Sequence, residues 1–277
     1  MKQKFAKFYN SVKNFVIDTN LSKPDEVVGA EVKTIENLET ELGIKLPDFL
    51  FSFFECFGEE IIVKGVDQSL NFAIKDFKYA NSKATEENII SILSDSEGLK
   101  DYYGDGSIWH VSDMMNLDNV LILNYSSLGR RYSFIDSTIE NPNLLFIYQK
   151  KYFERAEIDF IGGNVSFTNY IRTVLFDLVK EEFRKINEGK DVADGNSLQN
   201  YESVLSINKL KWAEYYSHFP KNKDLFFYAG KEFRQLRGEF YLLASKKETE
   251  NDTILTIDEF ELSFIDFLKE RNFNTSE

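Results

Sequence analysis

The sequence has one cysteine, Cys56, and two histidines among its 277 residues. A single cysteine forms no internal disulfide, so the fold must depend on its hydrophobic core. Neither a C-x-x-C nor an H-E-x-x-H pattern occurs, and these are spacings from which zinc sites are often built. We therefore expect no metal site and no bound cofactor. We expect Cys56, which lies in an apolar helical run, to act as a small buried hydrophobic residue.

Long apolar runs and an excess of positive charge are also missing. No stretch approaches the roughly 20 apolar residues of a membrane-spanning helix, and the lysine-containing residues 1–15 do not have the pattern of a signal peptide. The net charge is −13, whereas phosphate binding requires a cationic surface. We expect a cytoplasmic protein with no membrane and no direct nucleic-acid partner. The acidity either attracts a basic protein partner or serves solubility alone.

Catalytic patterns are scarce as well. His110 lies close to Ser112 and Asp113 in "IWHVSD", but neighbouring positions do not create triad geometry, and no G-x-S-x-G nucleophile elbow is present. Residues 101–107, "DYYGDGS", lack the ligand order of a calcium loop. Residues 161–164, "IGGN", lack the Lys-Ser/Thr of a phosphate loop. We expect structural roles for all three segments and predict no catalytic residue.

The sequence does contain ample material for a core, since 43% of it is hydrophobic and 15% aromatic. Apolar residues at helical spacing predict a helix over residues 3–16. Two shorter helices are predicted on either side of Leu46-Pro47, with Gly43 as a left-handed cap between them. Their apolar faces predict packing on one core. These faces comprise Ile35, Leu38 and Leu42 in the first helix and Leu50, Phe53, Phe54 and Phe57 in the second.

Strand patterns follow these helices. Alternating or apolar runs predict strands at 60–65, 68–74, 119–126 and 130–136, and the last two are expected to form a hairpin. Helices are predicted at 86–100 and 164–186, the second with Ser166 or Thr168 as its N-cap.

A polar, glycine-containing segment, 187–197, predicts a domain boundary. Beyond it we expect strands at 224–230, 238–245 and 252–257, then a closing helix at 257–273 with Thr256 and Glu259 in capping-box spacing. The predicted fold class is therefore α+β. Residues 1–187 would form a domain with helices packed on a mainly antiparallel sheet, and residues 188–277 a smaller α+β annex.

Residues 29–58, "GAEVKTIENLETELGIKLPDFLFSFFECFG", resemble the N-terminal signature of the SUKH superfamily. Residues 119–136 are similar to the central hairpin of that family, and 166–178 resemble its closing helix, so the resemblance covers about residues 20–185. The matching positions are Gly29, Ile35, Leu38, Glu39, Leu42, Gly43, Leu46, Pro47, Leu50 and Phe54 in the first motif and Leu121, Gly129, Tyr132 and Asp136 in the hairpin.

The sequence departs from the family pattern at 56–59, where relatives often have Asn-Gly-Gly. It also departs at Arg130-Arg131, where relatives often have glycines or acidic residues. Residues 188–277 have no counterpart in the family.

The resemblance implies an α+β fold and a function in binding. Many bacterial members of the superfamily are immunity proteins, which bind and neutralise a secreted toxin domain, often a nuclease. We therefore expect a cytoplasmic immunity protein that occludes a basic cognate toxin without catalysis. From their chemistry, the partner-binding candidates are an acidic aromatic loop and the hairpin turn: Asp101, Tyr102, Tyr103, Asp105, Trp109, Arg130 and Arg131.

Two alternatives stay open at this point. The first is an intracellular adaptor of the same fold whose partner is not a toxin. The second is a hydrolase built around His110 and a carboxylate that no motif identifies. Full function in cells after His110→Ala would exclude the hydrolase.

Overall fold

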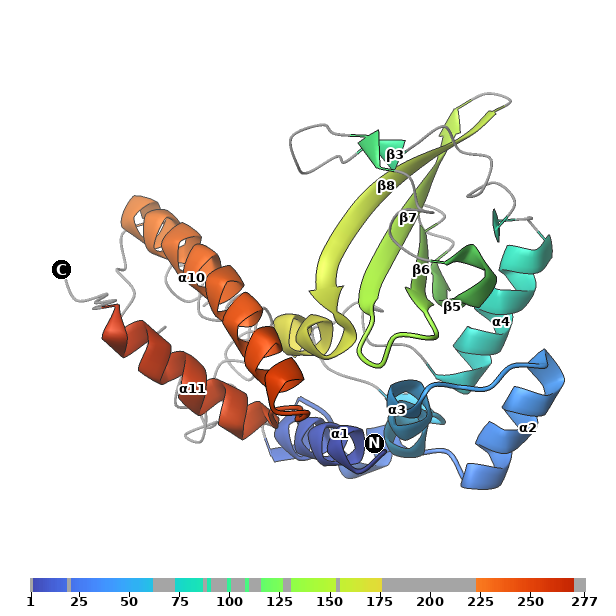
Figure 1. Ribbon diagram of the computed structural model, residues 1–277, viewed down its shortest axis with the longest axis horizontal. Coiled ribbons are helices and arrows are strands. Elements are labelled where there is room, and N and C mark those ends of the chain that lie inside the picture. The colour runs from blue at the N-terminus through green and yellow to red at the C-terminus, as the bar shows by residue number, and fades with distance from the viewer. Residues whose placement is uncertain are drawn as a thin grey trace, which may run out of the picture.

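The fold is α+β, with helices packed against an antiparallel sheet (Figure 1). The computed structural model describes residues 2–18, 21–61, 73–86, 89–90, 99–100, 108–109, 116–126, 131–152, 155–175 and 223–271.

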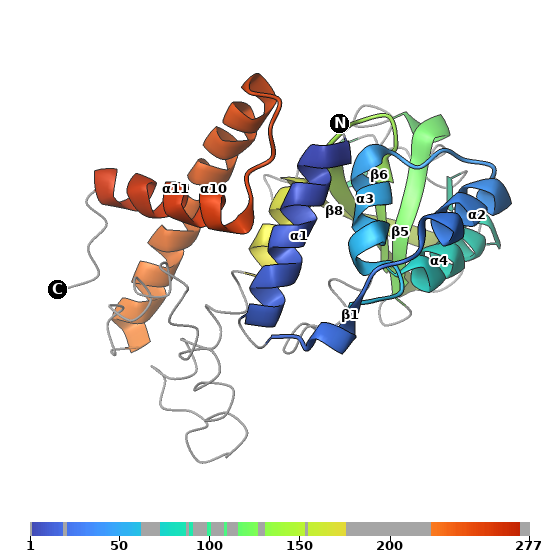
Figure 2. The ribbon, with the colours of Figure 1, turned by 90° about the horizontal axis from the view of Figure 1, so that it is seen from below.

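The N-terminal helix α1, Lys2–Asp18, confirms the helix predicted over 3–16. Its predicted apolar stripe is buried, with Phe5, Phe8 and Tyr9 fully inaccessible to solvent. In Figures 1 and 2, α1 lies between α3 on one side and the C-terminal helices on the other. The apolar face of α1 therefore packs against both α3 and the C-terminal helix α11.

The two short helices are also present, as α2, Val32–Leu42, and α3, Asp48–Phe57. Gly43 has φ 65° and ψ 27°, so the predicted left-handed cap is confirmed. The side chain of Glu39 accepts a hydrogen bond from the Leu46 backbone N–H (2.8 Å), which fixes the bend between the helices. Pro47 stands at the N-cap, one position before the helix begins.

Helix α3 is buried on more than its predicted face. Leu50, Phe53, Phe54 and Phe57 are buried as expected, but Phe49, Phe51 and Ser52 are buried too. Only a narrow face with Asp48, Glu55 and Cys56 stays accessible, so α3 lies largely within the core. The short ribbon of β1, Val27–Val28, and β2, Glu60–Ile61, lies at its C-terminal end, after the 3-10 turn Pro24–Glu26. The strand predicted at 60–65 is thus present in its described residues, 60–61.

The central sheet is a four-stranded antiparallel meander, β5-β6-β7-β8. The strands are β5, Val120–Ser126; β6, Arg131–Asp136; β7, Asn143–Tyr152; and β8, Arg155–Ser166. The predicted hairpin of 119–126 and 130–136 is confirmed, with Leu121 opposite Ile135. A separate ribbon pairs β3, Leu99–Lys100, with β4, Ile108–Trp109, and a 3-10 turn at Leu117–Asn119 leads into β5.

Helix α4, Ile74–Glu86, covers the edge of the sheet at β5 (Figure 1). The Asn81 side chain donates to the Ile122 carbonyl (2.7 Å) and accepts from the Ile122 N–H (3.3 Å), next to the irregular pairing between Ile122 and Asn124. These bonds satisfy backbone groups that an edge strand would leave unpaired. The predictions near α4 were partly wrong. The strand predicted at 68–74 is helical at Ile74, and the helix predicted at 86–100 is confirmed at 86 and 89–90 but is a strand at 99–100. Residues 68–72, 87–88 and 91–98 lie outside the described residues.

The helix predicted at 164–186 begins three residues later than expected, because β8 continues to Ser166. Residues 167–175 are helical, and the Ser166 hydroxyl accepts from the Asn169 N–H (3.4 Å), in agreement with its predicted role as a cap.

The strands predicted at 224–230 and 238–245 are wrong. Both ranges lie in one helix, α10, Lys223–Glu250. Phe240, Tyr241 and Ala244 are buried and fall on one helical face, which packs against the closing helix α11, Ile257–Glu270. Aromatic residues suit strands and buried helices alike, so tertiary packing decided the outcome.

The segment at 252–257 is a turn and an extended link between α10 and α11 rather than a strand. The capping box is confirmed, since Thr256 N–H donates to Glu259 Oε2 (2.9 Å) and Glu259 N–H donates to Thr256 Oγ1 (3.2 Å). Both described elements of the expected annex are therefore helices, and the predicted boundary at 187–197 lies outside the described residues.

A single hydrophobic cluster includes residues of α1, α3, the 167–175 helix, α10 and α11. Phe167 lies 5.3 Å from Phe49 and 5.6 Å from Phe53, measured between ring centroids. Phe240 contacts the rings of Phe260 (4.9 Å) and Phe264 (5.2 Å) in the same way. The C-terminal helices thus share a core with the N-terminal segment.

Candidate functional site

The residues predicted to bind a partner are not assembled into a site by the described structure. Asp101, Tyr102, Tyr103, Asp105 and Arg130 lie outside the described residues, as does His110.

For two of the predicted partner-binding residues, Trp109 and Arg131, the structure gives the position of the backbone in a strand. Trp109 belongs to β4, opposite Leu99. Arg131 begins β6, opposite Ser126 and Tyr148. The ribbon that holds Trp109 contacts the sheet at β8, while Arg131 lies on β6.

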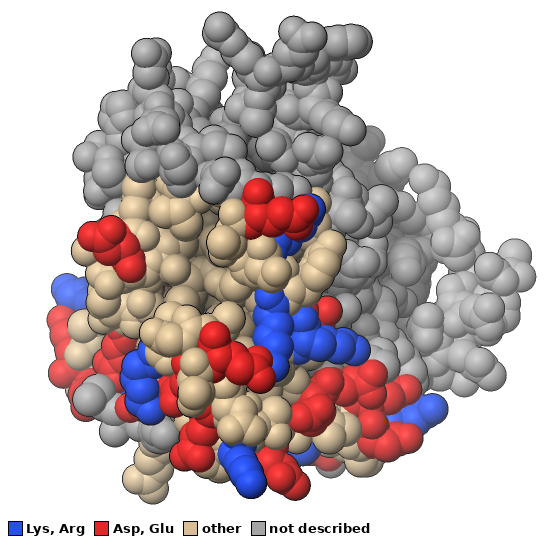
Figure 3. All heavy atoms as spheres, turned by 90° about the vertical axis from the view of Figure 1, so that its right-hand side faces the viewer, with Lys and Arg blue, Asp and Glu red and all other residues tan. Residues whose placement is uncertain are grey.

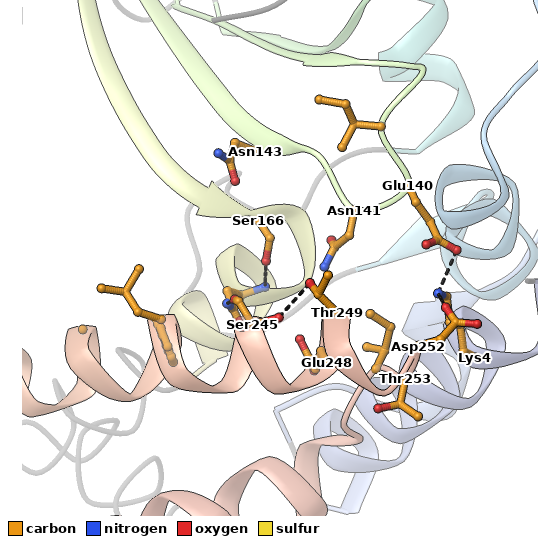
Figure 4. Close-up of a pocket in the computed structure, with 16 residues that line it drawn as sticks. Lys4, Glu140, Asn141, Asn143, Ser166, Ser245, Glu248, Thr249, Asp252 and Thr253 are labelled. Atoms are coloured by element: carbon orange, nitrogen blue, oxygen red, sulfur yellow. Dashed lines mark hydrogen bonds and ion pairs between the residues drawn. The ribbon is translucent and has the colours of Figure 1, made fainter.

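A groove that the sequence did not predict lies between the β6–β7 turn and α10 (Figure 4). Its volume is about 750 Å³, within the range typical of ligand-binding sites. We call it the α10 groove. Its walls come from α1, the 139–143 turn, the start of the 167–175 helix, α10 and the α10–α11 turn. The lining residues used below are Lys4, Ile139, Glu140, Asn141, Ser166, Asn169, Leu242, Ser245, Glu248, Thr249 and Asp252.

The wall between the sheet and α10 is polar, neutral and cross-linked. Asn141 donates to Thr168 Oγ1 (2.9 Å) and accepts from the Thr168 N–H (3.3 Å), which ties the β6–β7 turn to the helix after β8. Asn169 donates to the hydroxyl of Ser245 (2.7 Å) and so ties that helix to α10. These bonds hold amide and hydroxyl groups in fixed positions, which is the preorganisation that a binding site requires.

A buried ion pair supports this wall. Arg172, which is completely inaccessible to solvent, donates to Glu248 Oε1 (2.7 Å), Asn169 Oδ1 (2.6 Å) and the Leu255 carbonyl (2.5 Å). Its guanidinium also lies over the rings of Phe8 (4.9 Å) and Phe260 (4.3 Å). Arg172 therefore connects the 167–175 helix with α1, α10 and α11 at one point.

A three-residue ion cluster closes one end of the groove. The Lys4 ammonium lies 2.8 Å from Glu140 Oε1 and 2.6 Å from Asp252 Oδ1, as Figure 4 shows in part. Burial alone would lower the pKa of Lys4, but the bonds to Asp252 and Glu140 outweigh it and raise that pKa. The hydrogen bond from Lys4 lowers the pKa of Asp252. Lys4 and Asp252 therefore form a charged pair at neutral pH.

Two exposed apolar side chains complete the lining. Ile139, on the β6–β7 turn, is 46% exposed, and Leu242, on α10, is 72% exposed. Leu242 is the most exposed large hydrophobic residue in the described part of the chain. An apolar pair on different elements around one groove suggests binding, whereas single exposed leucines are common.

The chemistry of the α10 groove suits noncovalent binding. Its described lining contains no histidine or cysteine, and within the described ranges no three His, Cys, Asp or Glu side chains gather closely enough to hold a metal ion. The groove offers amides, hydroxyls, two acidic groups at one end and an apolar contact.

Cys56 lies away from this groove, on α3, and is half-buried. Burial raises the pKa of its thiol to about 11, with smaller opposing effects of Lys13 and Glu55. Its sulfur lies 3.8 Å from Asn10 Oδ1. A thiol with so high a pKa is a poor nucleophile. Cys56 packs against the core but is only partly buried, whereas the sequence predicted a buried residue.

Sequence reasoning missed the α10 groove because its parts are far apart in the chain. One local signal existed, since Arg172 interrupts the apolar stripe of its helix between Ile171 and Leu175, both buried. An arginine on a core-facing stripe requires a buried acidic partner. The partner, Glu248, is 76 residues away, between the segments 238–245 and 252–257 that we predicted as strands.

Every helix in the described segments is too short or too polar to span a lipid bilayer. In comparisons with known proteins, no family model matches the sequence, and neither a curated protein nor a solved structure is significantly similar to it.

Proposed function

We propose that this protein is an immunity protein of SUKH-like fold, which binds a basic toxin domain and neutralises it by occlusion, without catalysis. The observation that carries the proposal is the α10 groove. It is open and preorganised, it has exposed apolar side chains at its edge, and its charged groups Lys4, Glu140 and Asp252 are held together in one ion cluster. These properties favour stoichiometric binding over turnover.

The residues that carry the family resemblance support the proposed SUKH-like fold, because several of them are required by the local backbone geometry. A Cβ on Gly29 would lie 1.9 Å from the Glu55 carbonyl oxygen. Gly43 adopts a left-handed conformation, and Glu39 caps the bend before α3.

The matching aspartate of the hairpin has a task of the same kind. Asp136 is buried and accepts hydrogen bonds from Asn116 N–H (3.3 Å), Thr138 N–H (2.9 Å) and the Thr138 hydroxyl (2.6 Å). These residues define a helix–bend–helix unit and a hairpin, two of the three elements on which the resemblance rests.

Charge supports the partner part of the proposal. A net charge of −13 attracts a basic protein and speeds its capture. The charge is not concentrated on the face of α2 and α4. Figure 3 shows acidic side chains interspersed with lysines there, and Lys45 pairs with Glu39 and Lys78 with Glu41. This face is therefore a weaker candidate for the toxin contact than the α10 groove.

The test is co-purification of the full, tagged chain from its native cell, with identification of any protein recovered in stoichiometric amount. The recovered protein is then expressed alone and together with this chain. A basic protein that kills cells alone but not in the presence of this chain establishes immunity. A non-toxic regulatory partner establishes the adaptor function instead, and overturns the proposal.

A further inference from the structure

We infer that the α10 groove binds an extended segment of the partner protein in which an apolar side chain stands next to a lysine or arginine. The inference rests on the proposed function, because it takes the occupant to be part of that partner. It goes further by assigning the surface and the chemistry of the segment.

The apolar contact comes from Ile139 and Leu242. Their side chains are exposed by 46% and 72%, although an isoleucine on a turn and a leucine on a helix have no structural reason to be in water together. Covering these side chains favours binding, because it removes apolar surface from water. An apolar residue of the occupant placed between the β6–β7 turn and α10 would cover both.

The positive charge of the occupant follows from the acidic end of the groove. Among the described lining residues, Lys4 is the one cation, and it faces both Glu140 and Asp252. The third carboxylate, that of Glu248, is paired with Arg172. With Arg172 included, two positive groups meet three negative ones, so the site has a net negative charge. Asp252 is also the more exposed acid, with 81% of its side chain accessible, and it offers a carboxylate to an incoming ammonium or guanidinium.

The extended form of the occupant follows from the polar wall. Asn141, Ser245 and Thr249 line the groove with side chains that are at least partly exposed, and hydrogen bonds from Asn141 to Thr168 and from Asn169 to Ser245 fix two of them. Such groups match the alternating N–H and C=O groups of an extended backbone, which a helix would keep for itself. A volume of about 750 Å³ accommodates a few residues of such a segment.

The test uses a phage-displayed library of random linear peptides, selected on the immobilised full chain. The enriched consensus is synthesised with a fluorophore, and its Kd is measured by anisotropy for the wild type and for Leu242→Glu and Ile139→Glu. Leu262→Glu is the matched control, because Leu262 is also an exposed leucine on a C-terminal helix (44%) but does not line the groove. Melting temperatures verify that each variant is folded, and Ile139→Glu alone decides the outcome if Leu242→Glu does not fold.

We expect a consensus with an apolar residue beside Lys or Arg, and a Kd that rises about tenfold or more in both groove variants. The control should stay within about twofold of the wild type. Failure to enrich any peptide, an acidic consensus, or equal binding by wild type and groove variants would overturn the inference. Peptide binding that depends on the groove, without any toxic partner in the cell, would keep the inference and overturn only immunity.

Discussion

Replacement of Arg172 by Met tests whether the buried ion pair holds the C-terminal helices on the rest of the protein. The substitution removes the bonds to Glu248, Asn169 and the Leu255 carbonyl while keeping an unbranched apolar side chain. It leaves the Glu248 carboxylate buried, with the Leu255 N–H (2.8 Å) as its remaining described donor. Loss of one partner from a buried ion pair costs about 3–5 kcal/mol, because an uncompensated charge remains in the interior.

The second variant, Arg172→Met with Glu248→Gln, separates the charge from the packing. A glutamine at 248 keeps an oxygen for the Leu255 N–H and removes the stranded charge. We expect the double variant to be more stable than Arg172→Met alone by about 2 kcal/mol, since the penalty of the single variant comes largely from the unpaired carboxylate. The control is Lys246→Met, which breaks an exposed pair with Glu250 (3.8 Å) on the same helix and should cost less than about 1 kcal/mol.

Urea unfolding followed by far-UV circular dichroism gives the free energies, and hydrogen exchange shows where protection is lost. We expect Arg172→Met to reduce protection first in α10 and α11, which would then open at lower free energy than the sheet. A loss below about 1 kcal/mol for Arg172→Met, or a double variant less stable than the single one, would refute the claim that this pair anchors the C-terminal helices.

Three further predictions concern single positions. Gly29→Ala places a Cβ 1.9 Å from a backbone carbonyl oxygen of α3 and should destabilise the protein by about 3 kcal/mol or more. Gly43→Ala meets open space but has φ 65°, so it should cost only about 1–2 kcal/mol. Equal losses of stability in urea unfolding would contradict this difference. A hydrogen bond from Lys7 and a second one from the Thr256 backbone lower the pKa of Glu259. The stability that this carboxylate contributes is therefore present above its ordinary pKa and is lost as the pH falls through the pKa of the folded state. Because the Glu259 side chain is 46% exposed and solvent screens its ion pair, Glu259→Gln should cost less than about 1 kcal/mol at neutral pH. It should also flatten the loss of stability in acid, and an unchanged pH profile would argue against this. Cys56, with a pKa of about 11, should react with iodoacetamide on the order of a hundredfold more slowly in the folded chain than in urea, and equal rates would show an accessible thiolate.

Local patterns predicted several elements of the N-terminal half correctly. The stripes of α1 and α3, the left-handed Gly43 and the β5–β6 hairpin each depend on residues a few positions apart, so short-range spacing was sufficient. The capping box of α11 was predicted for the same reason.

In the C-terminal half, local patterns did not distinguish helix from strand. In α10, residues 238–245 contain aromatic and aliphatic side chains that fit a strand as well as a helix. Only the contacts of Phe240 and Tyr241 with Phe260, on another helix, distinguish the two. The α10 groove could not be predicted once α10 itself was missed, because much of its lining lies on that helix.

The residues that carry the family resemblance and the residues of the α10 groove are different sets with different physical roles. Gly29, Gly43 and Asp136 satisfy backbone geometry, and a relative with any partner would need them to reach the same fold. Ile139 and Leu242 keep 46% and 72% of their side chains exposed beside one groove, and the proposed partner segment accounts for that exposure. A resemblance built on the first set can therefore indicate the fold while it leaves the partner open. The residues of the α10 groove determine which segment binds, because a substitution there changes recognition without changing the fold.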